Sequence, residues 1–318
     1  PVAGAVVWHQ AHSRNNAYFI KDATARMSGE EQQGFTAADG SFQLAVIPGP
    51  GYLLVRGPTA DYLHEEISNV DLHGQLIWPN ARNYPDALKK IAPKPEESPL
   101  DVAFTLRRGA TVTGRLVGAD GRPVPEAVLF SRWYLGKRGI TVNHTQALQP
   151  LHGGRFELRG CDPAGSAPVF FLDAANQRGA MMEISGKQAG QDMDVVFQPC
   201  GTASVRLVGP EGKPIRPGLN PTNLEIILTP GDSFASAHFK QDESPLISDT
   251  IHVANLDRHR YRKLEVDADG RVTYPTLIPG AAYRISVYNQ PVKTEVEFSV
   301  KPGESKDLGD LVIHPRGR

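Results

Sequence analysis

Residues 110–129 read ATVTGRLVGADGRPVPEAVL and carry the clearest fold signal in the chain. The part from Ala110 to Val117 predicts a β-strand, Asp120-Gly121 predicts a tight turn, and Pro123-Val124 leads into a second strand. Glycine suits such a turn because it has no Cβ and therefore adopts positive φ without a clash. We expect an antiparallel hairpin here.

The same pattern recurs toward both ends of the chain. Apolar and polar residues alternate, as in half-buried strands, at residues 102–106, 203–207, 283–287 and 296–300. The turn recurs as Asp39-Gly40 and Asp269-Gly270 and, in weaker forms, as Gly153-Gly154 and Glu211-Gly212. The proline-valine phrase recurs as Pro1-Val2 and, more loosely, as Pro214-Ile215. Three copies of one small β unit therefore account for most of the chain.

The composition agrees with many short strands and argues against several classes of protein. The 318 residues include 31 Gly and 26 Pro, about 18% of the chain against an ordinary usage of roughly 12%, so long helices are disfavoured. The 34 basic and 35 acidic residues leave a net charge of −1, which argues against a nucleic-acid partner. The given sequence has no uninterrupted apolar stretch of the roughly 18 residues that a membrane span needs.

We expect an all-β fold of three tandem seven-stranded β-sandwiches, transthyretin-like or Ig-like, with short helical inserts. The first comprises residues 1–100 and includes a helix-containing connector, in which Tyr84 to Ile91 is the one stretch with helical signals. The second comprises residues 101–200. The third comprises residues 201–318 and contains a long insertion at about 231–268.

The first unit differs from the others at its start. In the second and third units a strand precedes the proline-valine phrase, whereas the given sequence begins with that phrase at Pro1. Two explanations stay open. The sequence is a fragment of a longer chain, which we favour, or a neighbouring chain donates the strand to the N-terminal unit.

A family resemblance follows from these phrases. Residues 111–117 with 120–124 resemble the opening of carboxypeptidase-regulatory-like domains, which are transthyretin-like β-sandwiches. Residues 170–173, 179–180, 184–190, 198–201 and 271–284 are similar to tandem-repeat proteins of this type that are abundant in planctomycete bacteria. The resemblance implies a non-catalytic part of a longer, extracytoplasmic protein, at the periplasm or cell surface.

These patterns are compatible with three functions. The leading hypothesis is a non-catalytic extracytoplasmic binding, spacer or structural module of a larger protein or assembly, with a protein or a cell-surface polysaccharide as partner. The second is a regulatory region of a membrane metallopeptidase whose catalytic domain lies outside this sequence. The third is a GDSL-like esterase with Ser233 of Gly231-Asp232-Ser233 as nucleophile, although Asp310 and His314 are spaced one residue too far apart for its base.

Candidate contact residues are aromatic or basic. Trp78, Trp133 and Tyr134 in the connectors could supply large contact areas, or else pack the inserts onto the sandwiches. Arg258, Arg260 and Tyr261 belong to the densest basic run, but acidic residues flank it, so a loop that docks on an acidic neighbour is favoured over a nucleic-acid site.

We expect no metal, cofactor or catalytic site. His64-Glu65-Glu66 begins like a zinc motif, yet Ser68 stands where the second histidine is required. His9 and His12 should point to opposite faces of a strand and so should not share a metal. Cys161 and Cys200 are expected at opposite poles of the middle sandwich, which predicts two thiols and no disulfide.

Overall fold

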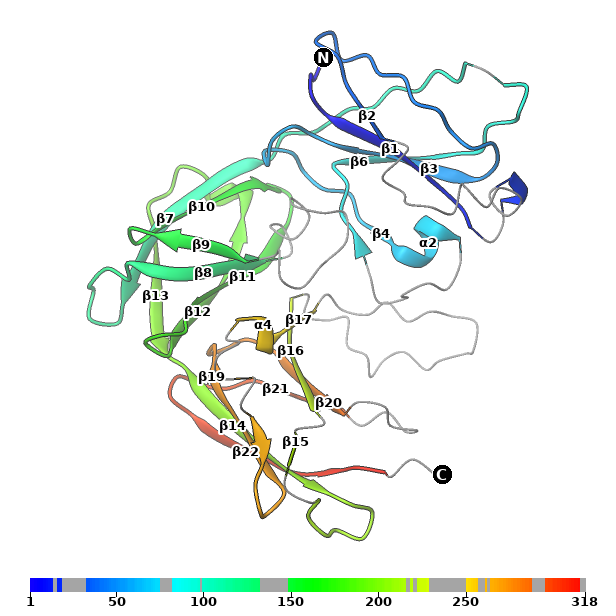
Figure 1. Cartoon of the computed structure of the whole chain (residues 1–318). Helices are drawn as coiled ribbons and strands as arrows, with labels where there is room; N and C mark the ends of the chain where they lie inside the picture. Colours follow the sequence, from blue (N-terminus) through cyan, green and yellow to red (C-terminus); the bar gives the residue numbers. More distant parts are fainter. Residues whose placement is uncertain are drawn as a thin grey trace.

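The computed structural model describes residues 1–13, 16–18, 33–74, 82–97, 99–131, 148–215, 218–219, 222–228, 250–256, 261, 264–287 and 295–314. Its regular structure is mostly β-strand (Figure 1), which confirms the all-β prediction. The named helices are short: α2 (Asn69–His73), η2 (Gly186–Gln188) and α4 (Val253–Leu256). Within the described residues, no helix is long and apolar enough to span a membrane.

The sheets divide the chain into three consecutive parts, which we call the N-terminal unit (1–108), the middle unit (109–200) and the C-terminal unit (201–314). In the N-terminal unit one sheet has the strand order β2-β1-β3-β6, formed by β1 (Val6–Ala11), β2 (Gln33–Phe35), β3 (Gly51–Arg56) and β6 (Ala87–Ile91). Val7 and Val55 are buried on one face, and Trp8 and Leu54 pack with Leu72 of α2 on the other. Strands β4 (Ile67–Ser68) and β5 (Arg82–Asn83) form a separate pair.

The predicted helix from Tyr84 to Ile91 is wrong. Residues Ala87–Ile91 form strand β6, which pairs antiparallel with β3 from Ala87 opposite Val55 to Ile91 opposite Gly51. Ala87 and Ile91 are buried, whereas Lys89 and Lys90 face solvent. Pairing with a buried neighbour strand stabilises this segment more than the weak helical propensity of its alanine, leucine and lysines.

The middle unit consists of two packed layers. One layer has the order β10-β7-β13, and the other has the order β12-β11-β8-β9. The strands are β7 (Ala110–Gly118), β8 (Glu126–Ser131), β9 (Gln149–His152), β10 (Arg155–Cys161), β11 (Ser166–Asp173), β12 (Arg178–Ser185) and β13 (Met193–Pro199). Only two residue pairs join β12 to β13, and the core lies between the layers, where the Phe171 ring meets Phe156 and Phe197 at 5.2 and 6.4 Å.

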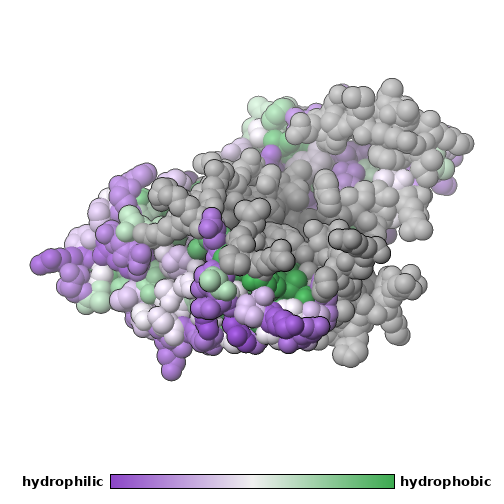
Figure 2. Space-filling view, turned by 60° about the horizontal axis from the view of Figure 1, so that its bottom comes forward, coloured by the Kyte–Doolittle hydropathy of each residue, from purple (hydrophilic) through white to green (hydrophobic). Residues whose placement is uncertain are grey.

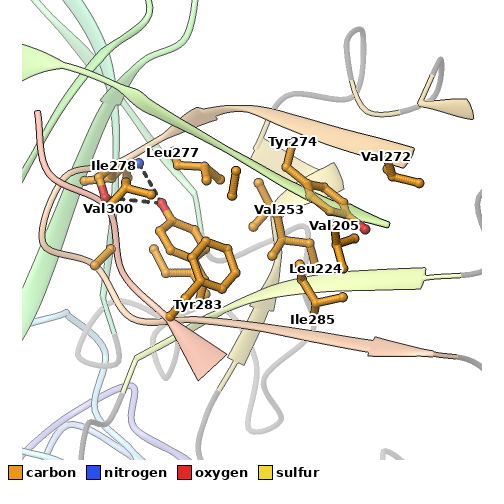
Figure 3. Packing of buried hydrophobic residues seen from close by; sticks show 14 of the residues in the cluster. Val205, Leu224, Val253, Val272, Tyr274, Leu277, Ile278, Tyr283, Ile285 and Val300 are labelled. Carbon is orange, nitrogen blue, oxygen red and sulfur yellow. Dashed lines mark hydrogen bonds between the residues drawn. The ribbon is translucent and has the colours of Figure 1, made fainter. Parts of the chain in front are cut away.

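The C-terminal unit repeats this arrangement of two sheets and has an additional two-stranded pair. Its main sheets have the orders β19-β14-β22 and β17-β16-β20-β21, and β15 pairs with β18. The strands are β14 (Gly201–Val208), β15 (Gly218–Leu219), β16 (Thr222–Ile227), β17 (Thr250–His252), β18 (Glu265–Val266), β19 (Arg271–Leu277), β20 (Tyr283–Val287), β21 (Glu295–Phe298) and β22 (Ser305–Val312). Tyr283 lies inside the core, where its oxygen accepts a 2.6 Å hydrogen bond from the N–H of Ile278 (Figure 3). Burial raises the pKa of this phenol far above its usual range.

The predicted turns are confirmed by the backbone. Gly40, Gly121, Gly212 and Gly270 have φ values of 81°, 76°, 74° and 76°. Each follows an acidic residue. Gly121 and Gly212 lie in the turn before the proline-valine pair, and Gly40 and Gly270 lie in the next hairpin turn of the repeat, so the excess of glycine in the sequence serves a definite conformation.

One strand position is filled in two units and open in the third. In the middle unit β7 lies between β10, to which it is antiparallel, and β13, to which it is parallel; β14 lies in the same way between β19 and β22. In the N-terminal unit the corresponding flanks are residues 41–47 and 101–107, and no strand lies between them in the described residues. We call this position the open edge. The predicted strand at 102–106 alternates between half-buried and exposed residues but joins no sheet.

Candidate functional site

Most of the predicted contact residues lie outside the described residues: Trp78, Trp133, Tyr134, Arg258 and Arg260. Tyr261 is described and is half-buried against the C-terminal core. Its hydroxyl donates a 2.5 Å hydrogen bond to the carbonyl oxygen of Pro275. The ring therefore helps to fix the segment before β18 onto strand β19.

The esterase hypothesis rests on residues that the structure describes only in part. Asp232 and Ser233 lie outside the described residues. Asp310 forms a two-point ion pair with Arg206, with nitrogen–oxygen distances of 2.6 and 2.7 Å. This carboxylate is thus engaged with a basic side chain across the β14–β22 pair.

The two strand histidines face opposite sides of the N-terminal sheet, as predicted. His9 Nδ1 accepts a hydrogen bond of 3.4 Å from the N–H of Ile47 on one side. His12 lies on the α2 side, where its ring centroid is 5.7 Å from that of Tyr52 and the C-cap Gly74 is in close contact. Across the part of the chain that the structure describes, no three histidine, cysteine, aspartate or glutamate side chains gather in a way that could hold a metal ion.

We expect the N-terminal unit to lose stability as the pH falls below about 6.5, the ordinary histidine value. The pKa of His12 is lowered by burial and then by Lys90, against the opposing effect of Asp71, and the pKa of His73 is lowered by burial and then by His12. Because the folded pKa values lie below the unfolded ones, the unfolded chain binds protons first, so this contribution is complete above the unfolded pKa and declines toward the folded pKa.

Hydrogen exchange of the β1 and β3 amides, measured from neutral to mildly acidic pH, checks this prediction. His12→Asn should flatten the dependence. His152→Gln, an exposed histidine of the middle unit, should leave it unchanged. If the exchange rates of these amides depend on pH to the same extent in the wild type and in His12→Asn, the prediction is contradicted.

The H-E-E motif contributes its histidine to a buried histidine–aspartate contact that the spacing of the motif does not reveal. His64 Nδ1 lies 2.7 Å from Asp86 Oδ1, and the two side chains are 8% and 4% exposed. Asp86 Oδ2 accepts a 2.8 Å hydrogen bond from the N–H of Gly57. Asp86 directly precedes β6, and Gly57 directly follows β3, so this hydrogen bond joins the start of β6 to the end of β3. Asp86 is 22 positions from His64 in the sequence, so only the tertiary fold brings the two side chains together.

A cavity of about 260 Å³ lies beside this pair and is lined by Gly4, Val6, Arg56, Gly57, Pro58, Thr59, Ala60, His64 and Asp86. The lining offers one hydroxyl, that of Thr59, which donates a 2.7 Å hydrogen bond to Asp61. In a nucleophile–histidine–carboxylate arrangement the hydroxyl must donate its hydrogen bond to the imidazole, whereas the Thr59 hydroxyl donates to Asp61. The geometry therefore favours a structural role for His64 and Asp86.

The second hollow is a groove of about 770 Å³ at the open edge. Phe42, Leu44 and Val46 line one wall, and Leu100 and Val102 line the other. These side chains are half-buried, except that Leu100 is exposed. An apolar groove between two extended segments is suited to binding an extended polypeptide.

The two cysteines are not joined in a disulfide. Cys161 is fully buried, and its thiol donates to the carbonyl oxygen of Leu158 at 3.3 Å. Cys200 is half-buried where the middle unit meets the C-terminal unit. Neither thiol is fully exposed at the surface.

Comparisons with known proteins identify no family: no family model and no curated protein matches the chain. Three solved structures show a remote likeness. The Bacillus anthracis TIE protein is 12% identical, with a TM-score of 0.22, over 97% of this chain and 47% of its own; this chain thus spans about half of that protein. Shaft pilin SpaA from Lactobacillus rhamnosus GG is 11% identical, with a TM-score of 0.23, over 66% of this chain and 99% of its own. A streptococcal ancillary pilin is 12% identical, with a TM-score of 0.25, over 99% and 93%.

Proposed function

We propose that the chain is a non-catalytic extracytoplasmic spacer or structural module of a larger protein or assembly, built from three tandem β-sandwiches. The observation that carries this proposal is a core shared between the middle and C-terminal units. A shared core makes two sandwiches move as one body, which a spacer requires. The carboxypeptidase-regulatory-like resemblance of residues 111–124 supports the same function and the extracytoplasmic location.

Strand β11 forms the shared core because both of its faces are buried. Val169 and Phe171 point into the middle unit, whereas Phe170 and Leu172 belong to the cluster of the C-terminal unit. Phe170 stacks on Phe130 of β8, with ring centroids 5.2 Å apart. The contact is close: a Cβ added at Gly179 of β12 would lie 3.0 Å from Ile278.

Backbone hydrogen bonds and a cation–π contact also hold the junction between the N-terminal and middle units. The N–H of Leu63 donates to the carbonyl of Arg107 at 2.8 Å, and the N–H of Gly109 donates to that of Asp61 at 2.7 Å. The Arg108 guanidinium lies 5.5 Å from the centre of the Tyr62 ring. Residues 61–63 thus hold the link that leads into β7, and the link is not a free hinge.

The surface adds no evidence for a highly charged partner. Basic and acidic groups pair across strands, as in Arg115 with Asp194 and Arg206 with Asp310. Figure 2 shows a described face that is mainly hydrophilic, with a small strongly hydrophobic area at its centre. Mixed charge of this kind suits a soluble module in an assembly.

A distance measurement tests the proposed rigidity. Spin labels would be placed at Arg122→Cys in the middle unit and Lys213→Cys in the C-terminal unit, whose side chains are 86% and 82% exposed. A Cys200→Ala background keeps the half-buried native thiol from reacting, and Cys161 is buried. Double electron–electron resonance should give one narrow distribution, because the shared core fixes the two units.

The control pair carries both labels in the C-terminal unit, at Lys213→Cys and Lys301→Cys, and measures the width that the labels themselves contribute. An inter-unit distribution as narrow as this control supports the spacer proposal. A much broader distribution would mean that the units move independently, and it would overturn the proposal.

A further inference from the structure

We propose that the cavity beside Arg56, which we call the Arg56 pocket, binds an acidic sugar residue of a polysaccharide. The sugar carboxylate would pair with the Arg56 guanidinium, and a face of the sugar chain would pack on the ring of Phe35. The pocket is the cavity of about 260 Å³ that lies beside the His64–Asp86 pair. This inference adds a ligand to the N-terminal unit and does not depend on the spacer function.

The pocket lies against an insertion in the N-terminal unit. Residues 57–86 link β3 to β6, whereas residues 174–177 and 288–294 link the corresponding strands of the other two units. Strand β4 and helix α2 of this insertion lie on one face of the sheet that contains β3 (Figure 1). The middle sandwich forms with a short link at the same place, so the insertion is not needed for the fold. Loops carried on a rigid sheet are common places for binding.

Arg56 takes a position that a buried leucine occupies in the middle unit. Val6 and Val128 are counterparts, because each follows the start of the proline-valine phrase by five residues. Val6 pairs with Arg56, and Val128 pairs with Leu172, which is 2% exposed in the shared core. Arg56 is half-buried, and its guanidinium has no hydrogen-bond or ion-pair partner within the described residues. A partly dehydrated charge without a partner favours the binding of an anion.

Phe35 provides an apolar platform on the same face of the sheet. Val6 of β1 pairs with Phe35 on one side and with Arg56 on the other, so the three side chains point the same way. Phe35 is 66% exposed, which is unusual for a phenylalanine. Strands β2 and β3 lie two strand spacings apart, about 10 Å, so a short oligosaccharide can contact both side chains. Sugar rings present C–H groups on their faces and pack well on an aromatic ring.

Hydrogen bonds fix the wall of the pocket next to Arg56. Asp86 accepts the N–H of Gly57 at 2.8 Å and lies 2.7 Å from His64 Nδ1. Both carboxylate oxygens of Asp86 are therefore engaged by protein groups. Among the described residues that line the pocket, Arg56 is the one lysine or arginine. The pocket thus offers one cation to a single carboxylate, which suits a polysaccharide with one carboxylate per sugar residue.

The same geometry argues against the carboxylate at the end of a polypeptide. Such a carboxylate is usually captured by several neighbouring backbone N–H groups. Here the N–H of Gly57 is taken by Asp86, and Pro58 has none. The volume of about 260 Å³ also lies below the roughly 300 Å³ at which sites for larger small molecules begin, so the pocket accommodates one sugar-sized group.

Titration calorimetry of the intact chain at low ionic strength tests the proposal. The probe is trigalacturonate, and its fully methyl-esterified form is the matched control, because it keeps the sugar chain but has no charge. We expect saturable one-to-one binding of the acid. The ester should bind at least about tenfold more weakly, because it offers the guanidinium no negative charge. Equal binding of the two forms would overturn the proposal.

Variants assign the carboxylate to Arg56. Arg56→Gln should weaken binding of the acid at least about tenfold and should make the acid and the ester bind alike, which is the coupling expected of a direct contact. Arg56→Lys, which keeps the charge, should retain the preference for the acid. Arg155→Gln, which removes an exposed arginine of β10, should have little effect. A preference for the acid that survives in Arg56→Gln, or an equal loss in Arg155→Gln, would contradict the assignment.

The platform is tested by a variant that changes no buried group. Phe35→Ser should weaken binding of the acid and of the ester by the same factor, about three- to tenfold, because the ring contacts the sugar and not its charge. Val196→Ser, which removes another exposed apolar side chain in the middle unit, should have no effect. An N-acetylated alanyl-phenylalanine with a free carboxylate should not bind. No binding of trigalacturonate at its highest soluble concentration would overturn the proposal, and so would binding of the dipeptide in its place.

Discussion

Replacing Phe170 by alanine should lower the free energy of unfolding by about 3–5 kcal/mol, the usual range for deleting a buried phenylalanine. Phe170 is fully buried and stacks on Phe130, and both belong to the core of the C-terminal unit although their strands belong to the middle unit. The loss should therefore fall on the contact between the units. In calorimetry, the middle and C-terminal units should unfold in one joint transition in the wild type and in two separate transitions in the variant.

Phe171→Ala is the matched control, because it deletes the same side chain from the next residue of the same strand. Phe171 packs inside the middle unit, against Phe156 and Phe197. Its loss should cost a similar free energy but leave the distance between labelled units as narrow as before. Phe170→Ala should broaden that distance. Identical effects of the two variants on the distance would contradict a role of Phe170 at the interface.

A double change, Glu295→Gln with Glu297→Gln, should lower the free energy of unfolding by about 3 kcal/mol, because it leaves the buried charge of Arg284 without these two carboxylates. The Arg284 side chain is 3% exposed and donates to Glu297 at 2.8 and 3.1 Å, with Glu295 at 3.8 Å. We take the lower end of the usual range because Glu297 is 40% exposed and Glu225 lies opposite Arg284 on β16.

Arg284→Met provides the comparison, since it removes the buried charge itself and keeps much of the side chain's volume. It should cost less than the double change, because Glu295 and Glu297 keep access to water. Urea unfolding of both variants measures the two free energies. A larger loss for Arg284→Met would show that the carboxylates, and not the guanidinium, carry the penalty of burial.

Local signals in the sequence predict a large part of the fold. Acidic-glycine pairs give positive φ at Gly40, Gly121 and Gly270, because that conformation depends on the residue itself. Alternation predicts β14 and β20, since each has one face on a core.

Other features depend on partners that are distant in sequence. Ala87–Ile91 becomes a strand because β3 offers pairing, and residues 102–106 join no sheet because no strand of the described residues lies beside them. The His64–Asp86 pair needs the whole N-terminal unit to form. The shared core does have a signal in the sequence: the run from Ala167 to Leu172 is apolar without alternation, which is typical of a strand buried on both faces.

The two buried faces of β11 have an evolutionary consequence. A substitution at Phe170 changes the surroundings of the C-terminal unit, so Phe170, Phe130 and Ile278 should vary together among related chains. The middle and C-terminal units should also be duplicated, lost or exchanged as a pair. A recombination break near Cys200 would separate β11 from half of its contacts, whereas a break upstream of residue 61 would leave both of its faces covered.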